Sequence, residues 1–317
     1  MELLFEPLGY DFMVRAIVTT ALSKRYPEVH ALDGVSIRLE ENRIHGLLGR
    51  NGAGKTTLMQ LLTGQVFATS GEMQVLGGSP VENVDVLSQT VFIQESQKYP
   101  DTFRAVDVLR IAAGAYPHWD QAYADTLVAQ FQLPERRMIK KLSRGQLSAI
   151  GIVIGLAARA PLTFFDEPYL GLDAVARQMF FDDLLADYTE HPRTIVLSTH
   201  HIDEVANLLE HVVILDQGKV LLEADTDDLH DAAMSVSGRA QAVDAFLAGR
   251  EVLERKALGT LATATFTPRD GDELAAREAG LELAPVSLQA LFVHLTTANA
   301  ASAAAADPDR AHDRAIV

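Results

Sequence analysis

Residues 49–56 have the sequence GRNGAGKT, and no other segment constrains the architecture of this chain as strongly. The segment matches the pattern G-x-x-x-x-G-K-[S/T]. It follows the apolar run Ile44–Leu48, which we expect to be a buried strand, and it precedes Thr57–Leu62, which has the composition of a helix. Glycines in this arrangement let successive backbone N–H groups and the start of a helix face negatively charged oxygens. The sequence therefore predicts a loop that binds phosphate groups.

Two side chains of this loop have specific chemical tasks. Lys55 is expected to reach the β- and γ-phosphates as a compact positive charge, and the Thr56 hydroxyl is a suitable ligand for Mg²⁺. The alternative is a glycine-rich turn that arose by chance. The strand before the loop and the helix after it argue against that alternative, because they are the context that the pattern requires.

An acidic pair follows a second apolar run. Leu162–Phe165 is expected to be a strand, and Asp166 and Glu167 come directly after it. Asp166 could hold Mg²⁺, and Glu167 could polarise an attacking water molecule as a general base. Taken alone, the pair could equally cap the next helix. The phosphate-binding loop in the same chain favours the catalytic interpretation.

Composition and charge exclude several classes of protein. The 317 residues are 48% apolar and 22% charged, which is typical of a globular chain with one large domain or two unequal ones. Lys and Arg number 27 against 43 Asp and Glu, so the formal net charge is −16 and a nucleic-acid partner is not expected. The chain has no cysteine, which excludes disulfides, cysteine zinc sites and thiol nucleophiles.

No stretch of the sequence has the pattern of a membrane span or a signal peptide. The longest apolar stretch, Ala149–Ala158, is shorter than the roughly 20 residues that a spanning helix needs, so a buried core helix is expected there. Residues 1–12 carry acidic and no basic residues, unlike the start of a signal peptide. We expect a cytoplasmic chain in which residues 1–12 are an N-terminal extension, with a misplaced start as the alternative.

Short apolar runs alternate with helical stretches, which predicts an α/β fold. The expected strands are Val14–Leu22 and Val35–Leu39 as an antiparallel pair, followed by Ile44–Leu48, Thr90–Ile93, Leu162–Phe165, Thr194–Leu197, Val212–Leu215 and, after a tight turn, Lys219–Leu222.

The same pattern predicts how the chain is divided. We expect a main domain over residues 13–225 with a helical subdomain inserted at about 95–160. A small α+β accessory domain is expected over 226–297, with helices at Ala240–Leu247 and Ser287–Leu295 and a strand at Leu261–Thr267. The Ala-rich tail, 298–317, is expected to be disordered.

Further motifs lie in an order that resembles the ATP-binding-cassette (ABC) ATPases. The sequence LSRGQ at 142–146 is similar to the signature motif of that family, and LGLD at 170–173 is similar to its D-loop. Gln94 resembles the Q-loop glutamine, His200 the switch histidine and Tyr26 the aromatic residue that stacks on adenine. The resemblance covers about residues 14–225.

The resemblance implies a fold, cofactors and a dimer. The implied fold is a P-loop α/β domain with a mixed sheet, an N-terminal antiparallel part and an inserted helical subdomain. The cofactors are ATP and Mg²⁺, with the ion held by Thr56, Gln94 and Asp166. ATP would lie between the phosphate-binding loop of one chain and the signature motif of a second copy in a head-to-tail dimer.

The resemblance also implies roles for individual residues. Catalysis is assigned to Glu167, His200, Gln94 and Lys55. The nucleotide-binding residues are Tyr26, Asn51, Gly52, Ala53, Gly54, Lys55, Thr56 and Thr57 of one chain and Ser143, Gly145, Gln146 and Asp173 of the other, with Asp173 coupling the two sites.

Several of these assignments have simpler alternatives. Gln94 could be a solvated loop residue, His201 stands beside His200, and Tyr26 could be a packing residue. Arg144 is a departure, because the family's commonest signature has glycine at that position. Its side chain could alter how tightly the dimer closes.

Among ABC proteins, the sequence favours the ATPase subunit of a transporter. The interval from Lys55 to Ser143 is too short for the coiled coils of the DNA-repair members, and translation factors of the superfamily carry two cassettes. Residues 116–120 (YPHWD) and 286–292 (VSLQALF) resemble bacterial drug- and antibiotic-exporter ATPases. The implied partner is a separate polytopic permease. The chain would lie peripherally on the cytoplasmic side of the membrane and would contact the permease near Gln94 and within residues 95–141. An ATPase that regulates a membrane complex without transport remains the alternative.

Overall fold

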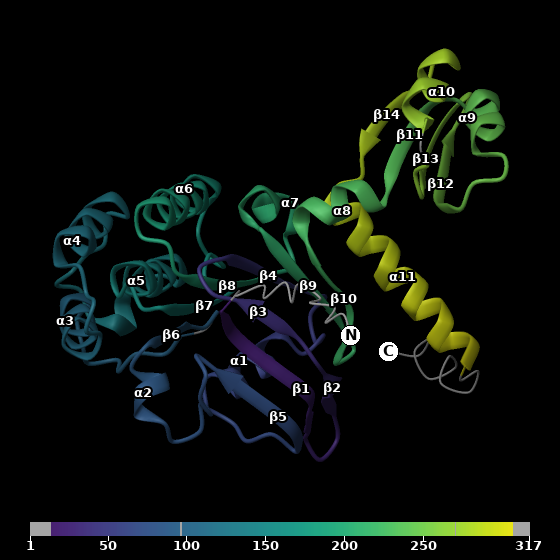
Figure 1. Cartoon of the computed structure of the whole chain (residues 1–317). Helices are drawn as coiled ribbons and strands as arrows, with labels where there is room; N and C mark the ends of the chain where they lie inside the picture. Colours follow the sequence, from purple (N-terminus) through teal and green to yellow (C-terminus); the bar gives the residue numbers. More distant parts are fainter. Residues whose placement is uncertain (1–13, 96, 270, 307–317) are drawn as a thin grey trace, which may run out of the picture. The chain divides into compact units, whose positions relative to one another are not determined.

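The computed structural model describes residues 14–95, 97–269 and 271–306, so the extension expected at 1–12 lies outside the described residues. The chain forms two compact units (Figure 1). The first unit contains residues 56–197 and the chain up to Arg43, and the second contains 44–55 and 198–317. The domain boundary predicted at 225/226 therefore falls within the second unit.

An antiparallel sheet lies at the start of the first unit. Its central strand β1 (Arg15–Arg25) pairs with β2 (His30–Val35), β3 (Arg38–Glu40) and β5 (Ser70–Val75). The predicted antiparallel pair is confirmed, although the second predicted strand is divided between β2 and β3.

Strand β5 was not predicted, because its sequence SGEMQV lacks an apolar run and only Val75 is buried. Gly71 permits its pairing with β1. The residue has φ +87°, and a Cβ there would lie 2.3 Å from the carbonyl oxygen of Ala21.

Three further strands of the first unit are neighbours in the order β8 (Thr194–Thr199), β7 (Leu162–Asp166) and β6 (Thr90–Ile93). The last two residues of β8 belong to the second unit. Strands β6 and β7 are parallel, with Ile93 opposite Phe165. Every residue of β7 is buried, as expected for a strand covered on both faces. Because parallel strands end at the same edge, Gln94 and Asp166 lie at one edge of the sheet.

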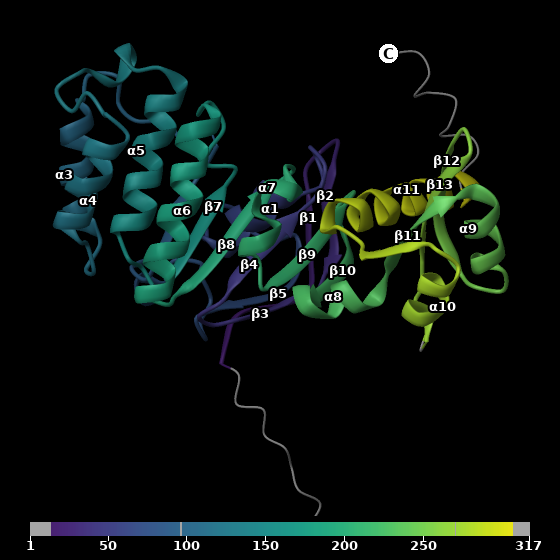
Figure 2. The same ribbon diagram turned by 90° about the horizontal axis from the view of Figure 1, so that it is seen from above.

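The helices of the first unit include a group between β6 and β7, in the region where a helical subdomain is predicted. The helices are α1 (Lys55–Leu62), α2 (Val84–Leu87), α3 (Ala105–Ala115), α4 (Gln121–Gln130), the 3-10 turn η1 (Ile139–Lys141), α5 (Arg144–Ala157) and α6 (Ala174–Glu190). Helices α3, α4 and α5 lie between β6 and β7 in the chain, whereas α6 follows β7. All four lie side by side in both views (Figures 1 and 2).

Helix α5 is the core helix of this unit, as predicted for Ala149–Ala158. All residues from Ala149 to Ala157 are buried. A helix that is apolar on all sides must be enclosed by other elements. Gly155 permits a close approach to β7, because a Cβ there would lie 2.4 Å from Cε1 of Phe165.

In the second unit, β4 (Ile44–Leu48) pairs in parallel with β9 (His211–Asp216), and β9 pairs antiparallel with β10 (Lys219–Asp225). The hairpin between β9 and β10 turns at Gln217 and Gly218, whose φ angles are +48° and +80°. Two consecutive positive φ angles match the twist of the flanking strands. Helix α7 (Ile202–Val205), the turn η2 (Ala206–Leu208) and α8 (Thr226–Ala232) complete this part.

The rest of the second unit begins with a β-α-β-β-α-β motif. Its elements are β11 (Met234–Arg239), α9 (Ala240–Leu247), β12 (Val252–Leu258), β13 (Leu261–Phe266), α10 (Asp272–Glu278) and β14 (Glu282–Pro285). The antiparallel sheet has the order β12-β13-β11-β14, which is the ferredoxin-like arrangement. Side chains of α9 and α10 pack with Val236, Ala264 and Phe266 on one face of this sheet.

The last helix corrects one expectation. The tail from Ala298 was predicted to be disordered, but α11 runs from Leu288 to Ala306. Alanine has the highest helix propensity of all residues, so an Ala-rich segment that follows a packed helix can extend it. Residues 307–317 lie outside the described residues. Among the helices that the structure describes, none combines the length and the apolar character needed to cross a membrane.

The packing of β7 can be tested with Phe164→Ala. Phe164 is 0% exposed and its ring meets Phe92 edge-on at 6.2 Å between centroids. Its truncation should lower the free energy of unfolding by about 3–5 kcal/mol in urea denaturation. Phe67→Ala is the control, because Phe67 is 65% exposed and its loss should cost under about 0.5 kcal/mol. Equal losses in the two variants would contradict this account of the core.

Candidate functional site

The loop 49–56 connects β4 to α1. Gly52 and Gly54 have φ angles of +80° and +109°, which residues with a Cβ rarely adopt. A Cβ at Gly49 would lie 2.7 Å from the carbonyl oxygen of Leu215. Lys55 is buried, and its Nζ donates to the Gly49 carbonyl at 2.7 Å and to the Arg50 carbonyl at 3.4 Å. The ammonium group is thus held inside the curve of a loop that only glycines can form.

Thr56 and Asp166 are brought together in the first unit. The Thr56 hydroxyl donates to Oδ2 of Asp166 at 2.7 Å, and Asp166 is buried. A hydroxyl and a carboxylate are hard oxygen donors of the kind that Mg²⁺ prefers, and Mg²⁺ needs only one or two carboxylates when phosphate oxygens complete its shell. The described residues contain no cluster of three or more His, Cys, Asp or Glu side chains suited to a metal. The pair therefore fits Mg²⁺ only together with a phosphate ligand.

Glu167 is buried and has a left-handed backbone with φ +48°. A non-glycine residue in this conformation is strained by about 1–3 kcal/mol, and such residues cluster at functional sites. Leu170 closes the following turn by donating its N–H to the Glu167 carbonyl at 3.2 Å. This conformation turns the chain from the acidic pair into the LGLD segment. No sequence pattern predicted it.

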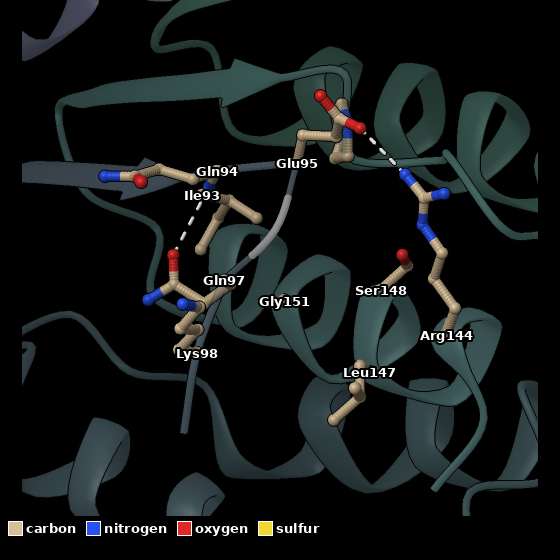
Figure 3. A pocket seen from close by; sticks show the side chains of 10 residues that line it. Ile93, Gln94, Glu95, Gln97, Lys98, Arg144, Leu147, Ser148 and Gly151 are labelled. Atoms are coloured by element: carbon tan, nitrogen blue, oxygen red, sulfur yellow. Dashed lines mark hydrogen bonds and ion pairs between the residues drawn. The ribbon is translucent and has the colours of Figure 1, made fainter. Parts of the chain in front are cut away.

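Gln94 follows β6 at the edge of the sheet where Asp166 lies. Its Nε2 donates to Oε1 of Gln65 at 2.9 Å, and its backbone N–H donates to Oε1 of Gln97 at 3.4 Å. Figure 3 shows its side chain directed away from Glu95 and Arg144. The structure does not place its amide on the Thr56–Asp166 pair. To hold Mg²⁺ as predicted, the Gln94 side chain would have to break its hydrogen bond to Gln65 and bind the ion instead.

In the second unit, His200 and the loop line one hollow of about 540 Å³, which we call the loop hollow. The ring of His201 contacts that of His200, with 3.9 Å between centroids and an interplanar angle of 42°, but His201 does not line the hollow. The structure thus groups His200, rather than His201, with the loop. The lining residues are Arg50, Asn51, Gly52, Ala53, His200, Asp216, Gln217 and Phe292.

Two residues in or beside the loop hollow were not predicted from the sequence. Phe292 comes from α11 and lines the hollow, and Asn299 on the same helix donates from Nδ2 to Oδ2 of Asp216 at 2.7 Å. Helix α11 also contacts α7, which begins two residues after His200. The apolar segment before Phe292 could reveal a packed helix, but nothing in the sequence indicates where that helix docks.

The residues of the signature motif share a second hollow, in the first unit. Ser143 caps α5: its Oγ accepts from the N–H of Gln146 at 3.2 Å, and Oε1 of Gln146 accepts from the N–H of Ser143 at 3.1 Å. Asp173 caps α6 by accepting from the N–H of Ala176 at 2.9 Å. Ser143, Gly145, Gln146 and Asp173 all line this hollow, which we call the signature hollow. It includes the N-terminus of α5, whose backbone N–H groups favour an anion.

Tyr26 follows β1 and is 37% exposed. Nζ of Lys24 lies 5.0 Å from the centroid of its ring, so a cation already contacts the aromatic side chain. Thr57 lies in the first turn of α1, directly after Thr56. Lys55 and His200 belong to the second unit, whereas Asp166 and Glu167 belong to the first.

Comparisons with known proteins agree with this geometry. A family model described as ABC transporter matches residues 32–170. The bacitracin transport ATP-binding protein BcrA of Bacillus licheniformis is 31% identical over 68% of this chain and 72% of its own length. The daunorubicin resistance ATP-binding protein DrrA3 of Streptomyces coeruleorubidus is 27% identical over 89% of this chain and 96% of its own. A solved ATP-binding subunit of an ABC transporter matches with a TM-score of 0.61 and 25% identity, over 68% of this chain and 92% of that one.

Replacing Lys55 tests the loop. Lys55→Ala removes the positive charge aimed at the phosphates and should weaken MgATP binding by about tenfold to a hundredfold, the value of a charge-assisted hydrogen bond. Isothermal titration calorimetry measures this directly. Lys256→Ala is the control, because Lys256 lies on β12 with its side chain 74% exposed. Unchanged affinity in Lys55→Ala would contradict the assignment of the loop.

Proposed function

The chain belongs to the family of ABC transporter ATP-binding proteins, and from this premise we propose that it binds MgATP between two head-to-tail copies of itself and hydrolyses it to drive a separate membrane permease of the drug- or antibiotic-exporter type. One observation carries the proposal. The 2.7 Å hydrogen bond from Thr56 to Asp166 joins the phosphate-binding loop to the acidic pair, although the two segments are far apart in the sequence.

Phosphate binding follows from the loop. The backbone N–H groups of residues 52–56 and the start of α1 favour an anion, and Lys55 adds a full positive charge. Thr56 and Asp166 are proposed to hold Mg²⁺, with Gln94 joining them. When bound, the ion neutralises negative charge on the β- and γ-phosphates. Tyr26 is proposed to stack on adenine with the ring that Lys24 also contacts.

Hydrolysis is an in-line transfer of the γ-phosphoryl group to water, so positioning and charge neutralisation supply most of the catalysis. Glu167 is proposed to orient this water and to accept its proton. Its strained backbone fixes the direction in which the buried carboxylate leaves the chain. His200 is proposed to donate to the γ-phosphate from the loop hollow.

The second half of the site is proposed to come from another copy of the chain. The signature hollow offers the Ser143 hydroxyl, the backbone of Gly145 and the N-terminus of α5, all suited to a phosphate group. The reciprocal hydrogen bonds of Ser143 and Gln146 fix this N-terminus. Because one chain carries every residue of both halves, a homodimer would have two complete sites, which Asp173 is proposed to couple.

The exporter assignment is supported by the relatives named for bacitracin transport and daunorubicin resistance. We assign the nucleotide-binding domain to residues 13–225, with its helical subdomain at about 95–160, and an accessory domain to 226–297. The permease is proposed to be a separate polytopic chain that holds this one at the cytoplasmic face of the membrane.

Glu167→Gln tests the chemistry. The amide keeps the shape of the side chain but cannot accept the proton, so phosphate release should fall by about a hundredfold or more. MgATP affinity in calorimetry should be unchanged. Glu72→Gln on exposed β5 is the matched control and should keep full activity. A Glu167→Gln rate within a few-fold of the unaltered chain would refute the general-base role.

The same variant tests the partner. Tagged Glu167→Gln chain with MgATP should retain a stoichiometric polytopic membrane protein when it is purified from membranes of the native cell. Recovery of soluble proteins alone, or of a homodimer without a membrane protein, would contradict the transporter proposal and favour a regulatory ATPase.

A further inference from the structure

Arg144 occupies an electrostatically unfavourable position. It is the first residue of α5, after the cap Ser143. The N-terminus of a helix carries partial positive charge, so a cation there costs about 0.3–1 kcal/mol at an exposed site. The stability of helix α5 therefore does not explain an arginine at this position. The contacts of the arginine side chain offer another explanation.

The side chain of Arg144 touches two other segments. Nη2 donates to Oε1 of Glu95 at 2.7 Å, and Figure 3 shows this bond crossing the space between α5 and the segment that follows Gln94. The methylene groups lie over Gly171, which has φ +95°. A Cβ at position 171 would approach Cγ of Arg144 to 2.8 Å. One side chain thus links α5 to the segment after Gln94 and to the turn after Glu167.

The contact with the turn is reinforced by two other residues of α5. Oγ of Ser148 donates to the carbonyl of Leu170 at 2.7 Å, and a Cβ at Gly145 would lie 2.5 Å from the carbonyl oxygen of Gly171. Between Glu95 and α5 lies a cavity of about 280 Å³, lined by both Glu95 and Arg144. The ion pair spans this cavity. The contacts of Ser148 and Gly145 with the turn do not involve the guanidinium of Arg144, so the pair can open while they persist.

The strength of the pair indicates what it can do. The side chains of Arg144 and Glu95 are 64% and 43% exposed. Exposed ion pairs contribute at most about 1 kcal/mol, which is too little to decide whether the domain folds. The same energy changes the ratio of two conformations about fivefold. The pair can therefore bias the position of the signature motif.

We propose that Arg144 is a positioning residue. Its ion pair with Glu95 ties the segment after Gln94 to the N-terminus of α5 and holds Ser143 and Gly145 in the register that receives ATP from the other copy. Opening the pair loosens the ATP-bound dimer without altering the affinity of one chain for ATP. This inference rests on the proposed head-to-tail dimer.

A double-mutant cycle tests the inference. Arg144→Met, which keeps the methylene groups over Gly171 and removes the guanidinium, Glu95→Ala and the double variant are made in the Glu167→Gln background. ATP-dependent dimerisation is measured by analytical ultracentrifugation. Each single change should weaken the dimer about three- to fivefold, and the double variant should be no weaker than either. The effect should shrink at high salt, because exposed pairs are screened. The calorimetric ATP affinity at concentrations below dimerisation, and the melting temperature without ATP, should not change.

Arg110→Ala is the control, because Arg110 forms an exposed pair with Asp107 at 3.6 Å in the same unit. The dimerisation constant of this variant with ATP should equal that of the Glu167→Gln parent. Additive losses in the cycle, or single variants that dimerise like the parent, would overturn the inference while the dimer stands. If the parent itself does not dimerise with ATP, the proposed function fails instead.

Discussion

A nucleoside triphosphate is an anion, and this chain has a formal net charge of −16, so the long-range field of the protein opposes binding. Binding must therefore depend on a short-range field inside the site, where water and salt screen charges only weakly. The loop 49–56 can supply it, because its glycine conformations curve the chain around the buried ammonium of Lys55, which donates to the Gly49 carbonyl. The other features of the site matter only if this loop keeps its shape, which makes the close contact of Gly49 with Leu215 a strict requirement.

The packed core of the first unit fixes where its sequence motifs lie relative to one another. Strand β7 ends in Asp166 and Glu167, and α5 begins with the signature motif. The two elements meet at the contact between Gly155 and Phe165, where no side chain fits between them. A rigid, close-packed contact of this kind sets the distance between the acidic pair and the signature motif. The turn after Glu167 then returns to α5 through the carbonyl of Leu170, so that motifs far apart in the sequence share one framework.

Apolar runs and glycine patterns made most of the strands predictable, because burial on both faces leaves a distinct sequence signal. Where that signal is missing, prediction failed. The exposed strand β5 has no apolar run, and the Ala-rich end of α11 was taken for a disordered tail. At the site, motif order led to Thr56 and Asp166 as expected ligands of one ion, and the structure adds the hydrogen bond between them. The hydrogen bond of Gln94 to Gln65 could not be foreseen, because it depends on long-range packing rather than on a local pattern.

The central claim is that one site is built from two copies of the chain, and complementation tests it most directly. Lys55→Ala disables the loop, and Ser143→Asp disables the signature hollow while keeping a residue that caps helix α5 well. Neither variant should hydrolyse ATP alone. An equimolar mixture should regain hydrolysis, because the loop of the Ser143→Asp chain then meets the intact signature motif of the Lys55→Ala chain. A mixture that stays inactive although both variants are folded, or a Ser143→Asp chain that is active by itself, would contradict the account.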